Sequence, residues 1–151
     1  MENEYKKINI IKDLTNQSIN PYDTSGMVLN NQEKKCVLIY DDDLEILFLC
    51  KAILSKSNYR IETLTRCENV IEDITRLKPD IILMDLWIPE IGGEKATDKI
   101  KKNSETQHIP ILIFSANPEI ETICKKVNAN GYIEKPFDII SFKETIKENI
   151  L

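Results

Sequence analysis

Long apolar segments are missing from this chain of 151 residues. No apolar run approaches the roughly 20 residues that a membrane-crossing helix needs. The amino-terminal stretch MENEYKKINI also lacks the basic-then-apolar pattern of a secretory signal. These absences argue against a membrane protein and favour a cytoplasmic one. The hydrophobic fraction of 42% and the charged fraction of 30% are those of an ordinary globular domain.

Cysteine motifs and basic clusters are scarce as well. The four cysteines, at positions 36, 50, 67 and 124, form no CxxC pair and lie in or beside apolar segments, so we expect buried free thiols. Lys and Arg form only short runs and the net charge is -5, so nucleic acid is not expected as a direct ligand. No GxxxxGK[ST] motif occurs, which excludes a P-loop nucleotide hydrolase.

Residues 1–35 differ in composition from the rest of the chain. They are polar, carry as many acidic as basic side chains, and contain the turn-forming residues Pro21 and Gly26. We expect an amino-terminal arm that is flexible or loosely packed, followed by one folded domain over residues 36–151. The whole negative excess of the chain then belongs to the folded domain.

From residue 36 onward, five short apolar runs alternate with five amphipathic stretches. The apolar runs resemble strands buried in a parallel sheet; they are CVLIY (36–40), RIETL (60–64), DIILM (80–84), PILIF (110–114) and GYIE (131–134). The predicted helices cover residues 44–57, 67–78, 94–103, 118–128 and 138–150. This order predicts a three-layer α/β domain with right-handed crossovers. We expect left-handed backbone angles at Asn128 and Gly131, which flank the last turn.

Polar residues stand directly after most of these predicted strands. They are Asp41, Asp42 and Asp43 after the first strand, Asp85 after the third, Ser115 after the fourth and Lys135 after the fifth. Open parallel sheets bind ligands at the carboxyl ends of their strands, so these side chains are expected to meet at one edge.

The chemistry of this group points to phosphoryl transfer. Adjacent carboxylates repel one another, and a hard oxygen-binding cation such as Mg²⁺ would relieve that repulsion. A further carboxylate beside the cation can attack a phosphoryl group, and in-line transfer then needs another positive charge and hydrogen-bond donors. Lys135 and Ser115 would supply these.

Taken singly, each residue has a simpler explanation. Asp43 is expected to cap the helix that begins at Leu44. Asp85 could cap a turn, Ser115 could bond to the backbone, and Lys135 could be a surface charge. Their joint placement at four strand ends favours the phosphoryl-transfer site.

Over residues 36–150 the chain resembles the receiver domains of two-component response regulators, such as the bacterial chemotaxis regulator. The resemblance rests on VLIYDDD, DIILMDLWIPEIGG, PILIFSA and GYIEKPF, which stand in the family's order and near its spacing. Pro89 and Gly93 match the loop after the third strand. The resemblance implies a flavodoxin-like, doubly wound, five-stranded parallel sheet with strand order 2-1-3-4-5 and helices on both faces.

The same resemblance implies a role for each acidic residue. Asp85 would be the phosphoacceptor, and Mg²⁺ would be held by Asp41, Asp42, Asp85 and the backbone carbonyl of Trp87. The large side chain of Trp87 could in addition screen the phosphoryl group from water and slow its loss.

The residues on the last two strands would respond to the phosphoryl group. Ser115 and Lys135 match the hydroxyl and the amine that contact its oxygens, and the bond from Lys135 to Pro136 is cis in such domains. Tyr132 matches an aromatic switch residue that swings inward as Ser115 moves; a half-buried strand aromatic is the simpler alternative.

The implied function is that of a signalling phosphoacceptor and not of an enzyme, apart from assisting its own phosphorylation and dephosphorylation. The donor would be a phosphohistidine on a histidine kinase or a histidine phosphotransfer protein. A separate downstream protein would bind the face formed by residues 118–128, 131–134 and 138–150, because no output domain is expected after Leu151. We expect a monomer or weak homodimer, with His108 a surface residue and not the donor.

Two alternatives from other classes are open. A phosphatase of the haloacid dehalogenase type also uses a nucleophilic aspartate with Mg²⁺, but it needs an acid two residues after the nucleophile, where Trp87 stands. A receiver that serves only for docking or dimerisation would not need the acidic pair, Asp85, Ser115 and Lys135 to be intact.

Overall fold

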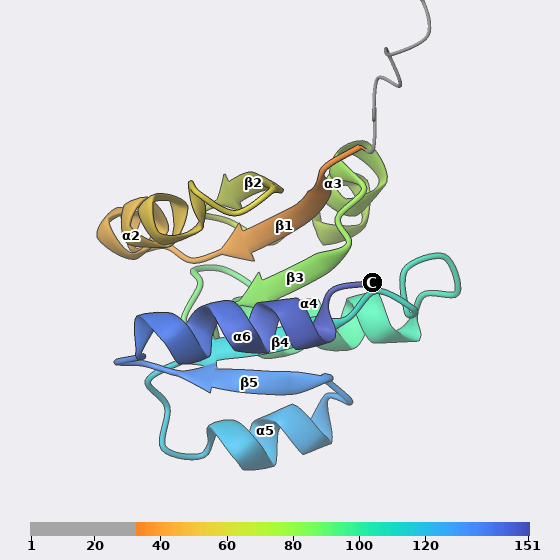
Figure 1. Cartoon of the computed structure of the whole chain (residues 1–151). Coiled ribbons are helices and arrows are strands. Elements are labelled where there is room, and N and C mark those ends of the chain that lie inside the picture. Colours follow the sequence, from red (N-terminus) through yellow and green to blue (C-terminus); the bar gives the residue numbers. More distant parts are fainter. Residues whose placement is uncertain (1–32) are drawn as a thin grey trace, which may run out of the picture. The chain divides into compact units, whose positions relative to one another are not determined.

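The computed structural model describes residues 33–151, and within them the chain forms one parallel sheet of five strands (Figure 1). The strands are β1 (Lys35–Tyr40), β2 (Tyr59–Leu64), β3 (Ile81–Met84), β4 (Ile111–Ser115) and β5 (Gly131–Glu134). Their order across the sheet is β2-β1-β3-β4-β5. The expected fold class and strand order are therefore confirmed.

Five helices connect or follow these strands within the described residues. They are α2 (Leu44–Leu54), α3 (Val70–Leu77), α4 (Gly92–Lys102), α5 (Ile120–Lys126) and α6 (Ile139–Asn149). Apolar side chains of α2 and α6 share one core cluster, whereas α3 and α4 pack into a second cluster on the opposite face of the sheet. Helix α5 packs on Ile113 of β4 in a third cluster. Both faces of the sheet are thus covered.

Strands β1, β3 and β4 lie in the middle of the sheet, and this position explains their continuous apolar sequences. Along β1, Val37 and Ile39 enter the cluster beneath α2 and α6, while Leu38 and Tyr40 enter the opposite one. Successive side chains of a strand point to opposite faces, so a strand covered on both sides needs apolar residues at every position. Each such buried side chain contributes roughly 1.5–3 kcal/mol.

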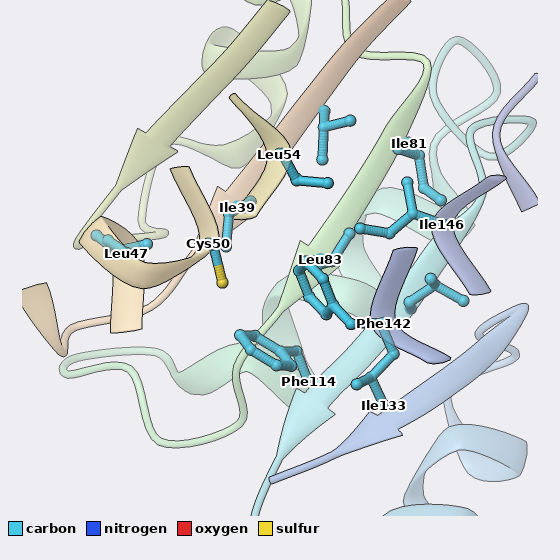
Figure 2. Close-up of a cluster of buried hydrophobic side chains, with 12 residues drawn as sticks. Ile39, Leu47, Cys50, Leu54, Ile81, Leu83, Phe114, Ile133, Phe142 and Ile146 are labelled. Atoms are coloured by element: carbon cyan, nitrogen blue, oxygen red, sulfur yellow. The ribbon is translucent and has the colours of Figure 1, made fainter. Parts of the chain in front are cut away.

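The core beneath α2 and α6 reaches up to the carboxyl ends of the strands (Figure 2). There Phe114 of β4 packs against Phe137 and against Phe142 of α6, with ring centroids 5.3 and 5.9 Å apart. Such tilted aromatic pairs contribute about 0.5–1.5 kcal/mol beyond area burial. The floor of the carboxyl edge is therefore apolar.

Helices α2 and α6 begin at aspartate caps on this edge. The side chain of Asp43 accepts hydrogen bonds from the N–H groups of Glu45 and Ile46, which confirms the predicted cap. Asp138, which the sequence analysis did not single out, caps α6 in the same way. A cap of this kind stabilises a helix by about 1 kcal/mol.

Two predicted backbone features are confirmed and one is wrong. Asn128 has φ 55°, and the bond from Lys135 to Pro136 is cis. Gly131, however, is not left-handed; it is the first residue of β5 and pairs with Leu112. An added Cβ at Gly131 would lie 3.1 Å from Cδ2 of Leu112, so close packing, and not a turn, explains the glycine.

All four cysteines are free and buried, as expected. Among the described residues, none of the helices is both long and apolar enough to cross a membrane. The expected arm of residues 1–35 lies outside the described residues except for its last three positions.

Candidate functional site

The backbone of the sheet brings the predicted site residues together at its carboxyl edge. The N–H of Asp85 donates to the carbonyl of Tyr40 at 2.9 Å, which places Asp85 beside the end of β1 and thus beside Asp41. The N–H of Lys135 donates to the carbonyl of Ser115 at 3.0 Å, which aligns the ends of β4 and β5 in the same manner. Four residues from distant parts of the sequence therefore share one rim.

Lys135 is the centre of the ion pairs at this rim. Its Nζ lies 2.5 Å from Oδ2 of Asp41 and 3.0 Å from Oδ1 of Asp85. Both carboxylates are almost fully buried, and the lysine is largely so. The Nζ also lies 4.4 Å from the ring centroid of Phe114, where the aromatic face attracts a cation. One ammonium group thus forms ion pairs with two buried carboxylates.

The remaining carboxylate oxygens are held by backbone donors. Oδ2 of Asp85 accepts the N–H of Trp87 at 2.7 Å, and Oδ1 of Asp41 accepts the N–H of Asp43 at 3.0 Å. Each carboxylate is therefore bonded through both of its oxygens, which fixes its orientation.

The charges at the site shift the pKa values of the buried groups. Burial raises the pKa of Asp41, and the nearby charge of Asp85 adds to this, although hydrogen bonds from Lys135 and Asp43 oppose it. Burial by itself disfavours the charge on Lys135, but the hydrogen bond to Asp41 and the charge of Asp85 outweigh it and raise the lysine pKa. Burial is thus the main cause of the raised pKa of Asp41, whereas the two carboxylates together raise the pKa of Lys135.

Three carboxylates converge closely enough to share a metal ion. Asp41, Asp42 and Asp85 each offer an oxygen, and these oxygens lie within 4.8 Å of one another. Asp42 is exposed, whereas the other two are buried. An all-oxygen donor set with an excess of negative charge fits a hard divalent cation such as Mg²⁺. The backbone of Trp87, the fourth predicted ligand, lies against Asp85 through its N–H.

Ser115 has a buried hydroxyl that lacks a hydrogen-bond partner among the described residues. The residue is fully buried at the end of β4. Leaving a buried hydroxyl unpaired costs about 1–3 kcal/mol, so such groups usually have a role that requires them. A polar ligand at the rim would give this hydroxyl a partner.

Most of the described chain matches one protein-family model. Residues 37–147 match the model described as the response regulator receiver domain.

The chain belongs to the response regulator receiver domain family.

Receiver domains of two-component systems are also its relatives among known proteins. The chain is 34% identical over 119 residues to the polar-differentiation response regulator DivK of Brucella anthropi, a match that covers 75% of this chain and 94% of that protein. It is 31% identical over 113 residues to the transcriptional regulatory protein KdpE of Staphylococcus aureus, covering 74% of this chain and 48% of that one.

Solved structures with the same fold include two receiver proteins. The chemotaxis protein CheY4 of Vibrio cholerae matches with a TM-score of 0.70 and 24% identity, over 78% of this chain and 99% of that one. The receiver domain of the sensor histidine kinase PA1611 of Pseudomonas aeruginosa matches with a TM-score of 0.70 and 23% identity, over 77% of this chain and 97% of that one. That structure has a magnesium ion coordinated in its active site cleft.

The loop after Asp85 in this receiver domain depends on two glycines. Gly92 has φ 74°, a left-handed angle that glycine adopts without strain. Glu90 has the same φ, although it is not a glycine. Gly93 lies in the first turn of α4, past the predicted loop, and a Cβ there would lie 1.8 Å from the carbonyl oxygen of Asp85. The sequence analysis named Gly93 but missed Gly92, although the adjacent glycine pair was the available signal.

The two aromatic residues that the sequence singled out are both exposed. Trp87 projects its side chain into solvent from the loop after β3, and Tyr132 is exposed on β5, where it pairs with Ile113. The aromatic residue that contacts a charged group of the site is instead Phe114, which the sequence analysis read only as part of a strand. In the sequence Phe114 is one more apolar residue of a buried strand, and nothing in that pattern indicates a contact with Lys135.

Proposed function

We propose that this receiver domain, over residues 36–151, accepts a phosphoryl group on Asp85 from a phosphohistidine of a histidine kinase or a histidine phosphotransfer protein. The observation that carries the proposal is the arrangement of Asp85 itself. It is a buried carboxylate that contacts an ammonium group, and that ammonium group contacts a second buried carboxylate. At the end of the neighbouring strand, Ser115 has a buried hydroxyl with no hydrogen-bond partner among residues 33–151. This is the set of groups that phosphoryl transfer to a carboxylate requires.

In the proposed step an oxygen of Asp85 forms a bond to phosphorus while the bond from phosphorus to the donor imidazole breaks. The imidazole leaves with the electron pair of the broken bond. Lys135 already touches Asp85 and would pair with the oxygens of the incoming group. The hydroxyl of Ser115 would donate to another of these oxygens. Because Asp85, Lys135 and Ser115 all belong to this chain, small phosphodonors would also modify Asp85 in this proposal.

Asp41 and Asp42, with Asp85 and the carbonyl of Trp87, would hold Mg²⁺. The bound cation would supply positive charge against the phosphoryl oxygens. Asp41 is preoriented for this by its bond to the N–H of Asp43, whereas Asp42 is exposed.

The added phosphoryl charge would shift an equilibrium between two states of the domain. Ser115 would move toward the phosphoryl group, and the exposed ring of Tyr132 would swing inward in response. Tyr132 lies on β5, between α5 and α6 (Figure 1). A separate downstream protein would read the change on the surface of these three elements.

Intact-mass measurement after incubation with acetyl phosphate and Mg²⁺ tests the proposal. We expect the mass of one phosphoryl group on the wild-type chain and none on Asp85→Asn. Asp98→Asn changes a half-exposed carboxylate on α4 that pairs with Lys102, so it serves as the matched control and should be modified normally. An unmodified wild type, or a modified Asp85→Asn, would show that the site assignment is wrong.

A further inference from the structure

Lys135 lies between two carboxylates and one aromatic ring, and the ring has no role in the transfer step proposed above. The Nζ of Lys135 contacts Asp41 and Asp85, and it lies 4.4 Å from the ring centroid of Phe114. The face of an aromatic ring carries partial negative charge, so it attracts an ammonium group that has lost much of its water. Among residues 33–151, Phe114 is the one aromatic residue in such a contact with a cation.

The three contacts together fix the position of the ammonium group. Contacts with the carboxylates of Asp41 and Asp85 alone would leave Nζ free to move around the line that joins them. Phe114 supplies a third contact from another element, because it belongs to β4 whereas Lys135 follows β5. The side chain of Lys135 is only 15% exposed, so water contributes little to its solvation. The ring is therefore a substantial part of the surroundings of this charge.

The ring of Phe114 is itself held in place by two neighbouring rings. Phe114 is fully buried, and its centroid lies 5.3 Å from that of Phe137 and 5.9 Å from that of Phe142 (Figure 2). Phe137 and Phe142 in turn stack on each other, with centroids 4.7 Å apart. A ring packed against two others in a dense core has little room to turn away from Lys135.

Core packing does not by itself require an aromatic residue at position 114. Leu112, two residues earlier on the same strand, fills the same core cluster with an aliphatic side chain, which would not attract a cation. Phe142 offers the matched comparison. It belongs to the same cluster and is 1% exposed, and within the described residues no cation lies over its ring.

We propose that Phe114 is a positioning residue for phosphoryl transfer, whose ring face holds the ammonium group of Lys135 where it can meet the oxygens of the incoming phosphoryl group. This inference rests on the proposed function, in which Lys135 pairs with those oxygens. As the phosphoryl group arrives, the ammonium group exchanges part of its contact with the carboxylates for contact with the new charge. The ring keeps it at the rim during this exchange, so the ring accelerates transfer and leaves the affinity for the donor unchanged.

The test varies the charge of the ring face while the shape of the ring is nearly kept. Phe114 is replaced by phenylalanine analogues with one and with three ring fluorines, which draw electron density away from the face and weaken its attraction for a cation. The same two analogues at position 142 are the matched controls. Phe114→Leu would also remove packing contacts, so the fluorinated rings, which keep these contacts, decide the question.

Initial rates of labelling by acetyl phosphate with Mg²⁺ are measured by intact mass over a range of donor concentrations. We expect the limiting rate constant to fall stepwise with the number of fluorines at position 114, by about threefold to tenfold for the trifluorinated ring. The donor concentration at half of the limiting rate should be unchanged, because Phe114 does not contact the donor in this proposal. Both analogues at position 142 should be labelled like the wild type.

Equal limiting rates for the wild type and the trifluorinated ring at position 114 would overturn the positioning role. An equal fall at positions 114 and 142 would overturn it too, because it would show a general effect of fluorine in the core. So would a change confined to the half-saturating donor concentration, which would place the effect in donor binding. A wild type that acetyl phosphate does not label would instead overturn the proposed function.

Discussion

Replacing Lys135 by methionine should strongly destabilise the domain when no divalent cation is present. The variant retains two buried carboxylates, on Asp41 and Asp85, but lacks the ammonium group that contacts both of them. Oxygens of these carboxylates lie within 4.8 Å of each other. At an effective dielectric constant of about 20, two unit charges at that distance repel by roughly 3.5 kcal/mol.

Removing one partner of a buried ion pair typically costs about 3–5 kcal/mol, which agrees with this repulsion. We therefore expect Lys135→Met to lose about 3–4 kcal/mol of unfolding free energy. Urea denaturation in EDTA at pH 7, followed by circular dichroism, would measure the loss. Lys143→Met alters an exposed lysine of α6 and should change the unfolding free energy by less than about 0.5 kcal/mol.

A double variant checks the physical cause. Asp85→Asn/Lys135→Met removes one of the two carboxylates, so it should be more stable than Lys135→Met alone. A loss below about 1 kcal/mol in Lys135→Met would refute this reasoning. A double variant that is no more stable than the single one would also refute it.

Four other predictions concern two glycines, the buried cysteines and Trp87. Gly93→Ala should cost about 3 kcal/mol in urea denaturation, because its Cβ meets the carbonyl of Asp85 at 1.8 Å. Gly131→Ala should cost less than about 1 kcal/mol, since only a leucine methyl lies near, at 3.1 Å; equal losses would contradict the packing argument. Burial raises the pKa of Cys50 to about 12 and that of Cys67 to about 11, so at pH 8 thiol reagents should label the folded chain far more slowly than the chain in urea. Rapid labelling without urea would show that these thiols are not buried. Trp87→Ser should shorten the lifetime of the phosphorylated form if the indole screens it from water, and an unchanged lifetime, measured by loss of phosphoryl mass, would remove that idea.

The order of strands and helices could be predicted from the sequence alone, because it depends on local patterns. Central strands covered on both faces need apolar residues at every position, and DIILM and PILIF show this directly. The ends of the elements were less well defined. The predicted helix 118–128 contains α5, which spans only Ile120–Lys126. Helix ends depend on capping and packing more than on periodicity.

The sequence by itself also determined which chemical groups follow the strands, and Asp43 could be separated from Asp41 and Asp42 as a helix cap. Only the tertiary structure decided that one lysine pairs with both Asp41 and Asp85, which lie 94 and 50 positions away along the chain. That pairing requires β1 to lie beside β3, and adjacency in a sheet is set by contacts between distant segments and not by local pattern.

The same physical reason explains what sequence reasoning missed or misjudged. Three such features are the closeness of Gly93 to Asp85, the strand position of Gly131, and the Ser115 hydroxyl that has no partner within residues 33–151. Each depends on which atoms the folded chain brings within a few ångströms. A sequence shows that a glycine or a serine is present, whereas its neighbours in space determine why it is needed. The sequence therefore shows which residue types follow each strand, whereas the fold determines which of these residues form ion pairs with one another.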